Sequence, residues 1–69
     1  MNTHTHNPKA NLRPADGETI QIGNGSLVVK RTLPIADGWI VDALGGSRWR
    51  IYEDGSALSS DYKATTWSR

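Results

Sequence analysis

The stretch Thr19-Ile20-Gln21-Ile22-Gly23-Asn24-Gly25-Ser26-Leu27-Val28-Val29 decides the fold class of this chain. Polar and apolar side chains alternate up to Ile22, which is the pattern of a half-buried β-strand. Asn24-Gly25 follows, and this dipeptide is the strongest short signal for a β-hairpin turn, because both residues tolerate positive φ angles. With Asn24-Gly25 as a two-residue turn, three pairs are predicted to face each other: Ile22 and Leu27, Ile20 and Val29, and Glu18 and Arg31.

The rest of the chain repeats this alternation of strand and turn. The strand over 27–33 is predicted to end at Pro34, because proline cannot donate a hydrogen bond within a sheet. Turn signals then fall at Ala36-Asp37-Gly38, Gly45-Gly46 and Asp54-Gly55, and they separate predicted strands over 39–44, 47–53 and 56–60. For residues 61–69 we expect a further strand in preference to a helical turn, since Thr65-Thr66 is β-branched.

This pattern predicts an all-β, mainly antiparallel domain: a single small meander of four or five strands over residues 18–69. The alternative is that the meander curls into a half-barrel. Residues 1–17 are polar and contain two prolines, so we expect a disordered N-terminal arm. The short edge strands carry few lysines to block edge pairing, which leaves a homodimer open.

Composition excludes several classes of protein. The chain has 69 residues, a net charge of +1 and no cysteine, which excludes disulfides, cysteine-ligated zinc and thiol nucleophiles. No apolar run approaches the roughly 20 residues of a membrane-spanning helix, and the N-terminus lacks a secretory signal. We therefore expect a soluble cytoplasmic protein of one domain, with no membrane association.

The predicted turns fix which side chains share a face. With Gly45-Gly46 and Asp54-Gly55 as two-residue turns, the core face carries a stripe of Ile40, Ile51 and Leu58, flanked by Trp49 and Leu44. Asp42 falls on this apolar face beside Trp49. An isolated carboxylate there would be unusual, but no base, nucleophile or oxyanion donor accompanies it.

The opposite face is predicted to present aromatic and basic side chains. Trp, Tyr and Arg are enriched among the residues that dominate protein interfaces. The candidate partner-binding residues are Trp39, Tyr52, Arg48 and Arg50, with Trp67 as an outlying anchor. The alternative is that Trp39 and Tyr52 form an ordinary cross-strand pair covered by another element.

Other chemistry finds less support. The candidate nucleic-acid contacts are Lys30, Arg48, Arg50 and Lys63, but a net charge of +1 is small for that role. His4 and His6 are too few for a preformed metal site, so no metal or cofactor is expected. Asp16, Asp37 and Asp54 each precede a glycine, which is turn chemistry, and no enzymatic activity is expected.

The sequence therefore favours a protein-binding module that occupies a partner surface, of the small accessory-inhibitor kind found in phages and mobile elements and directed at a host or defence complex. This comparison rests on size and composition. The alternatives are a nucleic-acid-binding β module on the same face and a structural, self-assembling subunit.

Overall fold

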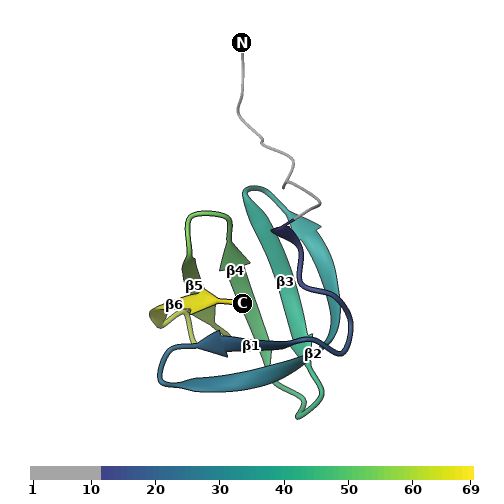
Figure 1. Cartoon of the computed structure of the whole chain (residues 1–69). Helices are drawn as coiled ribbons and strands as arrows, with labels where there is room; N and C mark the ends of the chain where they lie inside the picture. Colours follow the sequence, from purple (N-terminus) through teal and green to yellow (C-terminus); the bar gives the residue numbers. More distant parts are fainter. Residues whose placement is uncertain (1–11) are drawn as a thin grey trace.

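In the computed structural model, which describes residues 12–69, six antiparallel strands close into a small barrel (Figure 1). Each strand pairs with the next along the chain, and the last strand pairs back with the first. The strands are β1 (Thr19–Ile22), β2 (Gly25–Ile35), β3 (Gly38–Ala43), β4 (Arg48–Tyr52), β5 (Ser56–Ser59) and β6 (Ala64–Ser68). The all-β antiparallel meander predicted from the sequence is confirmed, and its two ends meet.

Closure of the barrel depends on β6, which falls within residues 61–69, where the sequence predicts a further strand. β6 pairs with β5 along one side and with β1 through the pairs Gln21–Ser68 and Ile22–Trp67 on the other. The strands predicted as free edges are therefore paired with each other. Because these stretches of β1 and β6 already pair with each other, they are not available for the edge-to-edge dimer considered above.

The first hairpin turns one position earlier than predicted. Ile22 pairs with Gly25 and Ile20 with Leu27, so Gly23-Asn24 forms the two-residue turn, with φ of 59° at Gly23. The shift moves each pairing by two residues and leaves Ile20 and Ile22 on the core side. The predicted pairing of Glu18 with Arg31 is wrong, because Glu18 instead accepts hydrogen bonds from Arg69.

Pro34 does not end its strand. It lies within β2 and is paired with Trp39 of β3. β1 pairs with β2 only as far as Val28, so this part of β2 has a strand partner on one side, which is where a sheet tolerates proline.

The β3–β4 and β4–β5 hairpins have loops of three residues where two were predicted. The Gly46 N–H donates to the Ala43 carbonyl at 2.9 Å, and the Gly55 N–H donates to the Tyr52 carbonyl at 3.0 Å. Both glycines have φ above 90°, as in a type I turn followed by a left-handed residue. One extra loop residue shifts the register by one and exchanges the two faces of a strand.

The core consequently differs from the predicted stripe. Trp39 lies opposite Ile51, and Val41 lies opposite Trp49, so these side chains point inward. Ile40 and Leu58 point outward, and Leu44 is exposed in a loop. The buried apolar side chains are Ile20, Ile22, Val29, Trp39, Val41, Ala43, Ile51 and Ala57.

The part of the predicted arm that the structure describes packs on the barrel. Leu12 contacts the core cluster and Pro14 is fully buried. The Gly17 N–H donates to the Val29 carbonyl at 2.7 Å. The folded unit therefore begins before residue 18, and the predicted arm over residues 1–11, with His4 and His6, lies outside the described residues.

Candidate functional site

The outward side of strands β2 to β6, called the outer face here, carries a row of side chains that crosses five strands. The register pairs each member with the next, from β2 to β6. Four members are apolar and the central one is an arginine. In strand order this outer row consists of Leu33, Ile40, Arg50, Leu58 and Ala64.

Tyr62 lies beside the centre of this row. Its ring lies 5.3 Å from the guanidinium carbon of Arg50, within the range of a cation–π contact. The side chain nevertheless remains 68% exposed. The ring therefore restricts the arginine while leaving a broad aromatic surface open to solvent.

The backbone of Tyr62 is unusual. The Tyr62 N–H donates to the Ser59 carbonyl at 2.9 Å, and the Ser59 N–H donates to the Lys63 carbonyl. This is the same three-residue loop that Gly46 and Gly55 complete, and Tyr62 takes the left-handed position with a φ of 62°. A bulky side chain at that position is a strained choice.

An ion cluster lies at the end of the outer face where β4 begins. Asp42 accepts from Arg31 Nε at 2.8 Å, and from Arg48 Nε at 2.7 Å and Nη2 at 3.2 Å. These hydrogen bonds, that of Arg48 foremost, hold the pKa of the Asp42 carboxyl well below its usual range. The same contact raises the pKa of Arg48. Asp42 therefore stays ionised and offsets part of the positive charge here.

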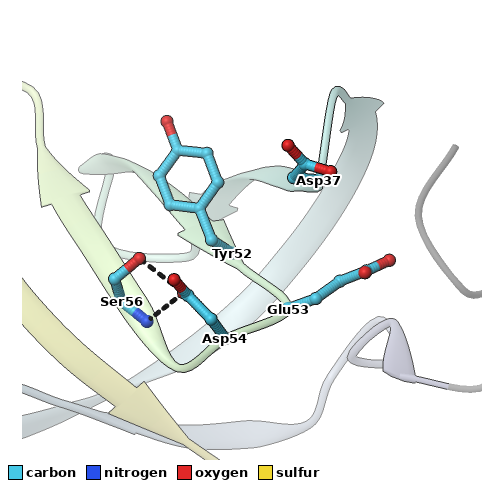
Figure 2. Close-up of a pocket in the computed structure, with 5 residues that line it drawn as sticks. All are labelled: Asp37, Tyr52, Glu53, Asp54 and Ser56. Atoms are coloured by element: carbon cyan, nitrogen blue, oxygen red, sulfur yellow. Dashed lines mark hydrogen bonds between the residues drawn. The ribbon is translucent and has the colours of Figure 1, made fainter. Parts of the chain in front are cut away.

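An open depression of about 370 Å³ lies at the other end of the outer face, beyond the end of β4. It is lined by Asp37, Tyr52, Glu53, Asp54 and Ser56 (Figure 2). Figure 2 shows the Tyr52 ring standing among these polar groups, between Ser56 and Asp37. Three carboxylates beside an aromatic ring suit a guanidinium or ammonium group.

Ser56 fixes one wall of this depression. Asp54 Oδ1 accepts from the Ser56 N–H at 2.9 Å and from its hydroxyl at 2.6 Å. These bonds, that of the hydroxyl foremost, lower the pKa of the Asp54 carboxyl. The depression thus carries a fixed negative charge. Among the described residues, no group of three or more histidine, cysteine, aspartate or glutamate side chains is placed to hold a metal ion.

Two of the predicted partner-binding residues do not lie on an exposed face. Trp39 is 1% exposed in the core, because the three-residue loop after β3 exchanges the two faces of that strand. Its predicted place on an aromatic surface is wrong. Trp67 is half-buried against the core, and its indole N–H donates to the Tyr52 carbonyl at 2.7 Å, so its polar group is engaged within the barrel.

The other predicted residues lie on the outer face or beside it. Arg48, Arg50 and Tyr52 alternate along β4 and point outward together. Lys30 lines a depression at the Asp42 end, and Lys63 is exposed next to Tyr62. The predicted residues that the structure brings together are therefore those of β4.

Sequence reasoning missed Tyr62 and the apolar members of the outer row. Leu58 and Ile40 were assigned to the core through the one-residue register error. Tyr62 gave no signal, because its loop contains no glycine to mark a left-handed position. Asp42 was the available signal. A charged residue on the predicted apolar face indicates that the predicted register of β3 is wrong and that Ile40 and Asp42 point outward.

Comparisons with protein families, with curated proteins and with solved structures found no match. Within residues 12–69, no helix has the length and apolar character needed to cross a membrane.

Proposed function

We propose that this chain is a non-enzymatic protein-binding module that acts by occupying a surface of its partner through the outer face. The observation that carries the proposal is Tyr62, which is bulky, exposed and held in a left-handed backbone conformation over Arg50. Tyrosine and arginine are among the residue types that contribute most to binding at protein interfaces.

The cost of Tyr62 to the folded state is part of the argument. A left-handed conformation costs a residue with a side chain about 1–2 kcal/mol, and glycine occupies the equivalent position in the loops after β3 and β4. A domain of this size has little stability to spare. A contribution to binding would account for a tyrosine at this costly position.

The chemistry of the surrounding row indicates how binding would occur. Ile40 and Leu58 flank Arg50 in the register, so an approaching protein buries apolar area on either side of a cation. The Tyr62 ring restrains the guanidinium before the partner arrives, which reduces the entropy lost on binding. A partner surface with apolar groups around a carboxylate matches this arrangement.

A second candidate function is single-stranded nucleic-acid binding. The observation in its favour is the stacking surface of Tyr62 beside two cations, Arg50 and Lys63. Bases stack on such rings while arginine and lysine contact phosphate. Against it, Asp42 offsets charge at one end of the face, and three carboxylates line the other.

Within the protein-binding proposal, the form we favour is an accessory inhibitor of a host or defence complex, of the kind that phages and mobile elements encode, acting in the cytoplasm. Its support is the small size of the chain, its lack of cysteine and its near-neutral charge. These are similarities of composition, and they are the reason for choosing a bacterial lysate in the experiment below.

The test compares the tagged wild-type chain with Tyr62→Gly in pull-downs from bacterial lysate, with and without nuclease. Loss of the exposed ring is expected to weaken capture of a protein partner by about 2 kcal/mol or more, as at a binding hot spot. Leu44→Ala is the control, because Leu44 is equally exposed but lies in a loop away from the row. Capture that disappears with nuclease would favour the second candidate.

Thermal melting of the same variants separates binding from folding. Tyr62→Gly relieves the strain of the left-handed backbone, which stabilises the folded chain. Two effects act against this gain: the ring–guanidinium contact, worth about 0.5–1 kcal/mol, is lost, and glycine gives the unfolded chain more conformational freedom. We expect the melting temperature to be unchanged or higher. A clear fall, with capture intact, would mean that Tyr62 serves the fold and would contradict the proposal.

A further inference from the structure

A second open depression, of about 320 Å³, lies at the Asp42 end of the outer face, where strands β2 to β4 meet the β3–β4 loop. It is separate from the acidic depression beside Tyr52, because the two have no lining residue in common. Six residues line it: Lys30, Asp42, Ala43, Gly46, Ser47 and Arg48.

A bulge in β2 brings two neighbouring cations to this end of the face. In a regular strand, adjacent side chains point to opposite faces. The register of β2 against β3 shifts between Val29 and Arg31, so Lys30 is an extra, unpaired residue, and a bulge of this kind re-aims a side chain. Arg31 consequently reaches Asp42 at 2.8 Å while Lys30 lines the depression.

Three hydrogen-bond donors of this depression are left unused within the described part of the chain. The exposed Lys30 ammonium group has no partner there. Arg48 donates to Asp42 through Nε and Nη2, which leaves Nη1. Ser47 Oγ accepts from the Trp49 indole N–H at 3.2 Å, so the hydroxyl proton remains available to another acceptor.

Asp42 orients the arginines and leaves the group of charges cationic. Both of its oxygens accept hydrogen bonds, from Arg48 and Arg31. With Lys30, three cations surround one carboxylate, so the group carries a net charge of +2. A phosphate monoester carries a charge of about −1.5 to −2 at pH 7, which matches this excess.

We propose that this depression binds a phosphate group, either the free ion or the end group of a small phosphate ester. The unused donors come from β2, the β3–β4 loop and β4, which suits the several oxygens of a tetrahedral anion. A planar carboxylate pairs best with two parallel donors of an arginine, and Asp42 already occupies Nε and Nη2 of Arg48. The site goes beyond the proposed function, since it needs no protein partner.

Titration of the nitrogen-15-labelled chain with sodium phosphate, followed by two-dimensional NMR at neutral pH and constant ionic strength, tests the site. The depression is open to water, so we expect weak binding, with a Kd of about 1 mM. The amide signals of Lys30, Ser47 and Arg48 should shift, together with the Arg48 Nε signal. Shifts spread evenly over the surface, or none at all, would overturn the proposal.

Lys30→Gln removes one cation, and no printed contact of the fold depends on it. Phosphate affinity should fall by about tenfold, as for loss of a hydrogen bond to a charged group. Lys63→Gln is the matched control, because it removes the same charge from an exposed lysine outside the depression. Ser47→Ala should weaken binding by about threefold. Thermal melting checks that each variant is folded.

Further probes identify the ligand chemistry. Both inorganic phosphate and glycerol phosphate should bind, and the tighter of the two identifies the free ion or the ester as the source. Acetate binding as tightly as phosphate would overturn the preference for a tetrahedral anion. An oligothymidylate without a terminal phosphate that binds more tightly per phosphate would overturn the proposal in favour of a nucleic-acid backbone.

This site and the proposed function fail separately. Equal phosphate affinity in Lys30→Gln and Lys63→Gln overturns the phosphate site. Capture of a protein partner is measured with Tyr62→Gly, and Tyr62 does not line this depression. Tyr62-dependent capture without phosphate binding would therefore leave the proposed function standing, and phosphate binding without such capture would leave the site standing.

Discussion

The indole N–H of Trp67 donates a 2.7 Å hydrogen bond to the backbone carbonyl oxygen of Tyr52, fifteen residues earlier in the chain. The Trp67 backbone also donates to the Gly55 carbonyl and lies opposite Ile22. One residue therefore connects the last strand, the β4–β5 loop and the first strand. The closed form of the barrel depends on this junction.

Replacing Trp67 with phenylalanine is expected to lower the free energy of unfolding by about 1 kcal/mol beyond the loss of packed area, because one hydrogen bond is removed. Urea denaturation measures the change. Trp49→Phe is the matched control, since that indole donates to the exposed Ser47 hydroxyl at 3.2 Å, which water can replace. Equal losses in both variants would show that the Tyr52 contact contributes little.

Trp39→Ala is expected to lower the free energy of unfolding by about 3–5 kcal/mol, as for other buried aromatic residues. Trp39 is 1% exposed and has the largest fully buried side chain among the described residues. For a domain this small the loss should leave the chain largely unfolded at 25 °C. Circular dichroism and urea titration measure it, and a folded, stable variant would contradict the face assignment.

Gly38→Ala is expected to disrupt the β3–β4 pairing. A Cβ at Gly38 would lie 2.0 Å from the Ile51 carbonyl oxygen and 2.8 Å from the Tyr52 Cα, so backbone would have to move. Gly45→Ala is the control, because nothing lies within 4 Å of the corresponding position. Thermal melting should show a large loss of stability for Gly38→Ala and little change for Gly45→Ala.

The Asp42 cluster predicts how stability depends on acid. Hydrogen bonds from Arg48 and Arg31 place the pKa of Asp42 in the folded chain below its value in the unfolded chain, which is about 3.9. Its contribution is therefore complete about one pH unit or more above that value and is lost as the pH falls towards the folded-state pKa. Urea midpoints measured between pH 7 and pH 2 should decline below about pH 5.

Asp42→Asn isolates this contribution. The variant keeps Glu18 and Asp54, whose pKa values are also lowered, but it loses the carboxylate that binds both arginines. Its stability should be lower at neutral pH and should fall less steeply in acid. Parallel profiles for the variant and the wild type would mean that the cluster does not couple to folding.

The sequence predicted the class and order of strands because turn residues and alternation are local signals. It did not predict the register of β3, because both of its faces carry apolar residues: Trp39 and Val41 on one, Ile40 on the other. Asp54-Gly55 fits a two-residue turn, and it also fits the end of a three-residue loop with glycine last. Local sequence does not distinguish the two, and the choice between them exchanges core and surface.

The candidate site was predicted in part for the same reason. Arg48, Arg50 and Tyr52 alternate along one strand, so they share a face in either register. Trp39 was assigned to the wrong face because the predicted register of β3 was shifted by one residue. Tyr62 could not be predicted, since a left-handed tyrosine is an exception to the propensities that guide sequence reading.

The pairing of β1 with β6 also bears on how the protein is made. A ribosome adds roughly 5–20 residues per second and releases the N-terminal strand first. β1 cannot pair with β6 at this stage, because its partner residues Trp67 and Ser68 are more than forty positions later in the chain. Folding of the barrel is therefore completed only after β6 has emerged from the exit tunnel, and until then the nascent chain depends on the local hairpins for protection from aggregation.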